Sequence, residues 1–240
     1  MPRMARIYVF LVSVLGALVL AATLQGSVHP LDPLRFATYF ALSLIAATLK
    51  LRLPGLTGTM SIGFVFALLG IAELTLPETM LMACMGVIVQ CLWRAKQRPT
   101  AVQVIFSVSA VALSVALAYS AAQLLRSKLQ AESIAIPMAL ATCCYFACNS
   151  ALVAGVLSMV QRKAFRTVWE QCYLLSFPYY LLGGAVAGMI AASSRQIGWQ
   201  LSLTMLPVMA LAYLFYHIYL DRLAVGLTGA AALSVYPNEH

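Results

Sequence analysis

The sequence predicts an all-α membrane protein, a polytopic transmembrane helical bundle with about eight spans. Hydrophobic residues make up 62% of the chain and charged residues only 9%, whereas soluble domains carry about 25% charged residues. Eight apolar stretches follow one another with short connections between them. The connections are alternately rich and poor in lysine and arginine, which is the pattern of a chain that crosses a bilayer repeatedly.

Each stretch is an expected span, because about 20 apolar residues cross the hydrocarbon core as a helix. The fourth stretch has 15 residues and as a helix covers only about 22 Å. It closely follows Pro77, so we expect the third and fourth stretches to form a tight hairpin, with one of them tilted, thinly spanning or partly re-entrant. In order, the stretches are Ile7–Leu24, Leu34–Leu49, Leu56–Leu76, Thr79–Trp93, Val102–Leu125, Ile134–Val160, Tyr173–Ala192 and Gln200–Leu220.

The basic residues predict the sidedness of the chain. If every stretch crosses the bilayer, eleven lysines and arginines lie on one side, and only Arg35, Arg126, Lys128 and Arg195 lie on the other. The richer side is cytoplasmic in such proteins. We therefore expect cytoplasmic N and C termini and a multi-pass protein of the inner (plasma) membrane. The net charge of +8 is accounted for by this topology and by contact with anionic lipid headgroups, so the lipid bilayer is an expected partner and nucleic acid is not.

The two ends of the chain need separate interpretations. Arg3 and Arg6 precede an 18-residue apolar run, as in a signal peptide. That run is long for a signal peptide, and Ala21–Gln25 offers a poor cleavage site, so we expect an uncleaved first span. Cleavage would leave seven spans. We expect residues 1–222 to form the integral membrane domain and residues 223–240 a short C-terminal tail.

Cysteines and enzyme motifs suggest no catalytic or metal site. All six cysteines lie within or beside the expected spans, which disfavours a disulfide framework. The run from Cys143 to Cys148 lacks the paired spacing of a structural zinc site. The chain also has no hydrolase, metalloprotease, phosphate-loop or dinucleotide motif. We therefore predict a non-enzymatic protein with no catalytic residue, metal or cofactor.

Five polar side chains are candidates for a ligand site within the spans: Glu73, Tyr145, Asn149, Tyr179 and Tyr180. Glu73 is the one acid inside an apolar run, and such acids usually face a bundle interior or a wet cavity. The first interpretation is a carboxylate that reaches the outer headgroups, and a ligand or proton site is the alternative. Asn149 needs hydrogen-bond partners if buried, so hydrogen bonds to neighbouring helices are its first interpretation and ligand contact is the alternative.

Residues 161–172 predict a short interfacial helix on the cytoplasmic side. Apolar residues recur there at helical spacing, and Arg162, Lys163 and Arg166 fall on the other face. With Trp169, these residues are also candidates for docking a cytoplasmic partner.

Gly184 and Gly188 have the spacing at which small residues let two membrane helices approach closely. Packing within one monomer is the first interpretation, and a homodimer interface is the alternative.

A series of apolar and aromatic motifs extends over about 170 residues from Leu51 onward. In this order the motifs resemble the membrane-sensor region that precedes HD-GYP phosphodiesterase or GGDEF cyclase domains in bacterial cyclic di-GMP signalling proteins. The chain departs from the pattern after Asp221 and Arg222, where no output domain of either kind follows. The motifs are Ser61–Pro77 with Glu78, Phe146–Asn149, Val168–Glu170 with Ser176–Tyr180, and Leu206–Pro207 leading to Tyr216–Leu220.

The resemblance implies a sensor-like membrane module that signals through a separate cytoplasmic protein. The alternative is a small-molecule transporter or a substrate-binding membrane component, since short and proline-interrupted spans are compatible with a midplane site. An intramembrane enzyme is the third option, which the missing catalytic motifs disfavour.

Overall fold

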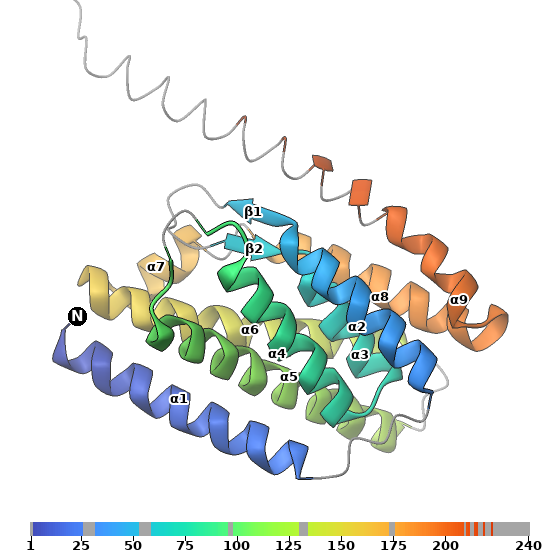
Figure 1. The fold of residues 1–240 in the computed structure, drawn as a ribbon, viewed down its shortest axis with the longest axis horizontal. Helices are drawn as coiled ribbons and strands as arrows, with labels where there is room; N and C mark the ends of the chain where they lie inside the picture. Colours follow the sequence, from blue (N-terminus) through green and yellow to red (C-terminus); the bar gives the residue numbers. More distant parts are fainter. Residues whose placement is uncertain are drawn as a thin grey trace, which may run out of the picture.

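The computed structural model describes residues 2–25, 32–52, 59–95, 98–129, 134–172 and 176–208, and a few positions between 210 and 222. The predicted tail, 223–240, lies outside them. The described part is almost entirely helical (Figure 1). Its elements are α1 (Arg3–Leu24), α2 (Pro33–Thr48), β1 (Lys50–Arg52), β2 (Thr59–Ser61), α3 (Gly63–Glu73), α4 (Leu76–Leu92), α5 (Ala101–Leu129), α6 (Ala135–Gln161), α7 (Phe165–Cys172), α8 (Phe177–Ile197), α9 (Trp199–Ser202) and a 3-10 turn at Leu203–Met205.

The predicted helical class is confirmed, with one addition. Strands β1 and β2 form a short antiparallel ladder in which Lys50 faces Ser61. Within the described residues, three helices are long and apolar enough to cross a membrane: α1, residues 101–128 of α5, and α6. The eight spans and the cytoplasmic termini remain predictions.

The third apolar stretch, Leu56–Leu76, does not form one continuous helix. Strand β2 occupies residues 59–61 of this stretch, and α3 begins only at Gly63. The Ser61 hydroxyl donates to Gln90 Oε1 at 2.8 Å and accepts from the Gly63 N–H at 3.3 Å, so it joins the strand to the start of the helix and to α4. The eleven residues of α3 rise only about 16 Å, roughly half of the hydrocarbon thickness.

Helix α3 is the centre of the bundle. Every residue from Phe64 to Ile71 is buried, and α2, α4, α5, α6 and α8 all pack against it. A helix that is apolar on all sides is stable in such surroundings because no face needs solvent. The outer helix α1 instead exposes a row of large apolar side chains that suits contact with lipid: Met4, Ile7, Phe10, Leu11, Leu15 and Leu18.

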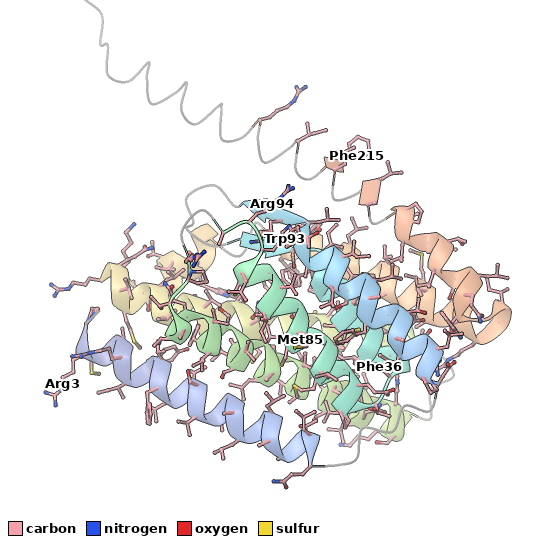
Figure 2. All side chains as sticks on the ribbon, viewed as in Figure 1. Arg3, Phe36, Met85, Trp93, Arg94 and Phe215 are labelled. Atoms are coloured by element: carbon pink, nitrogen blue, oxygen red, sulfur yellow. The ribbon has the colours of Figure 1, made fainter. Side chains whose placement is uncertain are left out.

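Successive long helices run back and forth, so the bundle has two ends (Figure 1). The hairpin end holds β1 and β2, the last turns of α2, α4 and α6, and α7. There Lys50 Nζ donates a hydrogen bond to the Trp93 carbonyl, and Figure 2 shows Trp93 and Arg94 beside the hairpin. The distal end holds the start of α2, the connection between α3 and α4, and the last turns of α5 and α8. Figure 2 shows Phe36 toward this end.

Candidate functional site

A cluster of charged and aromatic side chains lies at the distal end, where α2 begins and α3 ends. Arg35 and Tyr39 are four residues apart on α2, so both project from the same face. The Tyr39 hydroxyl donates a 2.7 Å hydrogen bond to Oε2 of Glu73, the last residue of α3. Arg35 Nη1 lies 3.6 Å from the same oxygen. One carboxylate oxygen thus interacts with both a phenol and a guanidinium group.

Two helix caps bring further carboxylates to this cluster. Asp32 caps α2, because its Oδ1 accepts a 3.0 Å hydrogen bond from the Arg35 N–H, and its Oδ2 lies 3.8 Å from Arg35 Nε. Thr75 and Glu78 form the capping box of α4, in which Glu78 Oε2 accepts from the Thr75 N–H at 2.7 Å and from its hydroxyl at 2.6 Å. Asp and Thr are favoured at these positions since they satisfy free backbone N–H groups. The local sequence therefore fixes both helix starts beside Glu73.

The cluster is buried but its hydrogen bonding is incomplete. Tyr39 is fully buried, the Glu73 side chain is 6% exposed and that of Arg35 is 24% exposed. Among the described residues, Glu73 Oε1 and Arg35 Nε have no hydrogen-bond partner although both atoms are buried. An unsatisfied buried polar atom costs about 1–3 kcal/mol, and more when it is charged. A bound molecule that supplied the missing partners would recover part of that cost.

A cavity of about 240 Å³ lies beside these atoms. Three carboxylates and one guanidinium group line it, so its lining is negative when the acids are ionised. Within the described residues, no group of three His, Cys, Asp or Glu side chains is placed to hold a metal ion. The arrangement therefore suits the binding of a small polar molecule. The lining residues are Asp32, Arg35, Ala72, Glu73, Leu74, Thr75, Glu78 and Tyr119.

The predicted tyrosines gather elsewhere, around Phe64 at the first turn of α3. The Phe64 ring lies 4.3 Å from that of Tyr180 and 5.4 Å from that of Tyr179, between centroids. The Tyr145 ring is 6.2 Å from that of Tyr180, which is also hydrogen-bonded to Asn149. Phe64 and Glu73 are nine residues apart, or roughly 14 Å along the helix. The structure thus brings four of the five predicted ligand residues together and places Glu73 at the other end of α3.

The predicted docking residues lie on and before α7 at the hairpin end. Arg162, Lys163 and Arg166 are exposed, and Arg166 Nε donates a 2.7 Å hydrogen bond to Glu170, which raises the pKa of the guanidinium group. Trp169 instead faces the bundle, where its Nε1 donates to Ser150 Oγ at 2.9 Å. The amphipathic helix therefore attaches to α6 through its indole and leaves its cations accessible.

Gly184 and Gly188 both face α6 along a groove of about 610 Å³ between α6 and α8. A Cβ on Gly184 would overlap Thr142 Oγ1 and would lie 2.9 Å from Thr142 Cγ2. A Cβ on Gly188 would lie 3.7 Å from Met138 Cβ, an ordinary contact distance. Close packing within the chain thus depends on Gly184 and much less on Gly188. A homodimer through these residues stays a prediction.

Sequence reasoning found Glu73 but missed its partners Arg35 and Tyr39. One signal was available: Arg35 is one of only four basic residues on the expected outer side, and Glu73 lies near the expected outer end of its stretch. Two opposite charges at the same depth of a membrane bundle are expected to pair.

The fold and this site define a membrane-associated helical module with a polar cavity at one end. The sequence pattern of the MASE9 family matches residues 8–192, so the chain belongs to the MASE9 family. MASE domains are membrane-associated sensor domains of signalling proteins, which confirms the resemblance to a membrane-sensor region. A comparison with curated proteins finds no match, and neither does a comparison with solved structures.

Proposed function

We propose that this chain is a non-enzymatic sensor module of the bacterial inner membrane that spans the bilayer several times and reports to a cytoplasmic protein. The observation that carries the proposal is the buried Glu73 carboxylate beside a cavity, because one of its oxygens has no hydrogen-bond partner in the part of the chain that the structure describes. An acid buried in a membrane bundle is costly, and such residues mark functional sites. We assign the cavity as the input site, with Glu73, Arg35 and Tyr39 as its central residues.

The charge distribution supports an orientation for this module. The hairpin end carries the exposed cations around α7 and the amino end of α1, whereas Arg35, Arg126, Lys128 and Arg195 lie at the distal end. With the positive-inside rule, the hairpin end faces the cytoplasm and the cavity faces the outer side. Residues 1–222 form the membrane domain in this proposal.

Helix α3 offers a physical connection from the input site to α7. It ends in Glu73 at the cavity and begins near Phe64, whose ring contacts that of Tyr180 on α8. The Tyr180 ring lies 5.2 Å from that of Phe146 on α6, and Phe146 lies 6.5 Å from the Trp169 ring on α7. Buried rings in contact do not move independently. A ligand that favours one position of α3 would therefore favour one position of α7, provided that it binds the two states with different affinity.

A binding experiment on the cytoplasmic surface tests the proposal. The protein is reconstituted in nanodiscs and titrated with cyclic di-GMP enzymes and sensor kinases of its source organism. Replacing Arg162, Lys163 and Arg166 by glutamine, or deleting 162–171, should abolish binding of the cognate protein. The matched control replaces Arg126 and Lys128 by glutamine and should bind normally. Equal loss in both variants, or binding that survives the deletion, would contradict docking at α7.

A further inference from the structure

We propose that the distal cavity binds a primary ammonium ion that carries a hydrogen-bond acceptor two or three bonds away. This inference rests on the assignment of the cavity as the input site and names the chemistry of its ligand. Two atoms carry it. Among the residues that the structure describes, Glu73 Oε1 is a buried acceptor without a donor, and Arg35 Nε is a buried donor without an acceptor.

The hydrogen-bonding needs of the site define complementary groups on the ligand. The Tyr39 hydroxyl and Arg35 Nη1 both lie at Glu73 Oε2, which leaves Oε1 to receive a donor from the cavity. Asp32 Oδ2, at 3.8 Å from Arg35 Nε, is beyond hydrogen-bond length. One molecule with a donor and an acceptor close together would satisfy both Oε1 and Nε.

The excess of negative charge in the cavity lining favours a cationic hydrogen-bond donor on the ligand. Asp32, Glu73 and Glu78 outnumber the single guanidinium of Arg35, so an anion would meet net repulsion and a neutral donor would leave the excess charge uncompensated. A charge-assisted bond from an ammonium to a carboxylate is roughly twice as strong as a neutral one. A calcium or magnesium ion fits less well, because it needs six or more oxygen ligands and Glu78 Oε2 is already bonded to Thr75.

The size of the cavity limits the ligand to a small group. At about 30 Å³ per water molecule, a volume of 240 Å³ corresponds to about eight waters. Ethanolamine, with one ammonium and one hydroxyl, fits this volume and chemistry. The same ammonioethyl group occurs in the headgroup of phosphatidylethanolamine, where its oxygen is esterified to phosphate and still accepts a hydrogen bond, and the distal end is where headgroups lie in the proposed orientation. Free amine and lipid headgroup are two sources of one ligand chemistry.

The test compares ethanolamine with choline, whose trimethylated nitrogen has no N–H donor. Wild-type protein in detergent free of phosphatidylethanolamine is titrated calorimetrically with each compound and with acetate. In a second arm, the thermal midpoint is compared between nanodiscs of phosphatidylethanolamine and nanodiscs of phosphatidylcholine. Binding of ethanolamine but not of choline or acetate supports the free amine. Stabilisation by phosphatidylethanolamine alone supports the headgroup.

Variants locate the binding to this cavity. Glu73→Gln should weaken binding at least tenfold, whereas Glu170→Gln on α7 should leave it unchanged. If Glu73→Gln does not fold, the difference in binding of ethanolamine and choline by the wild-type protein is the test of the inference. Equal responses to ethanolamine and choline, a preference for acetate, or no difference in either arm would overturn the inference. The titration needs no cytoplasmic partner, so its failure is separate from a failure of the signalling proposal.

Discussion

Substitution of Gly184 by alanine should destabilise the bundle, and the same substitution at Gly188 should not. The added Cβ at Gly184 would overlap Thr142 Oγ1 and approach Thr142 Cγ2 to 2.9 Å. Ordinary contacts begin near 3.4 Å, so α6 and α8 must separate or Thr142 must leave its rotamer. At Gly188 the nearest atom, Met138 Cβ, is already 3.7 Å away.

The magnitude follows from two opposing terms. Alanine gains about 0.5–1 kcal/mol over glycine in a helix, and this gain applies at both positions. Overpacking costs about 1–3 kcal/mol, and it applies only at Gly184. We therefore expect Gly188→Ala to be the more stable variant by about 1–3 kcal/mol.

Reversible unfolding in mixed micelles of a mild detergent and sodium dodecyl sulfate measures this difference. Adding Thr142→Ala to Gly184→Ala removes Thr142 Oγ1 and Cγ2, keeps only the 3.0 Å contact with the Cβ of residue 142, and should recover part of the loss. Equal stability of the two single variants, or no recovery in the double variant, would refute the described packing of α6 on α8.

Two further substitutions test the other contacts. Trp169→Phe removes the indole N–H that donates to Ser150; the lost hydrogen bond costs about 1 kcal/mol of stability and should increase proteolysis near α7. Arg166→Gln changes a side chain that is 86% exposed and should leave proteolysis unchanged. Equal proteolysis of the two variants would contradict the anchoring role of Trp169. Tyr39→Phe removes a 2.7 Å bond to the buried carboxylate at the end of α3 and should lower the free energy of unfolding by about 1.5–3 kcal/mol. Tyr119→Phe loses only a 3.5 Å hydrogen bond to the Leu74 carbonyl and should lower the free energy of unfolding much less. If Tyr39→Phe is as stable as the wild type, the hydrogen bond between Tyr39 and Glu73 does not stabilise the bundle.

The sequence predicted the helical class well, because hydropathy and charge alternation act on each segment separately. It did not predict that Leu56–Leu76 divides into a strand and a short central helix. A continuous apolar run has the same hydropathy whether it crosses a bilayer or lies in a protein core. Only the packing of five helices around α3 distinguishes the two cases, and that packing is a tertiary property.

The site was predictable in part for a related reason. Glu73 was identified because an acid in an apolar run is costly wherever it lies. Arg35 and Tyr39 were not, since their approach depends on how α2 crosses the end of α3. A helix over residues 161–172 was predictable from the spacing of its apolar residues, but the hydrogen bond from Trp169 to Ser150 depends on the angle between α6 and α7.

Hydrogen exchange of α7 tests most directly whether the cavity communicates with the proposed cytoplasmic surface. Backbone amides of residues 165–172 would be followed by mass spectrometry in nanodiscs, for the wild type, Glu73→Gln and the distal control Lys128→Gln. We expect Glu73→Gln to accelerate exchange in α7 severalfold, because α3 loses its fixed end and the ring contacts to Trp169 loosen. Lys128→Gln should match the wild type. Exchange in α7 that is unchanged by Glu73→Gln, with changes confined to α2, α3 and α4, would contradict the sensor account.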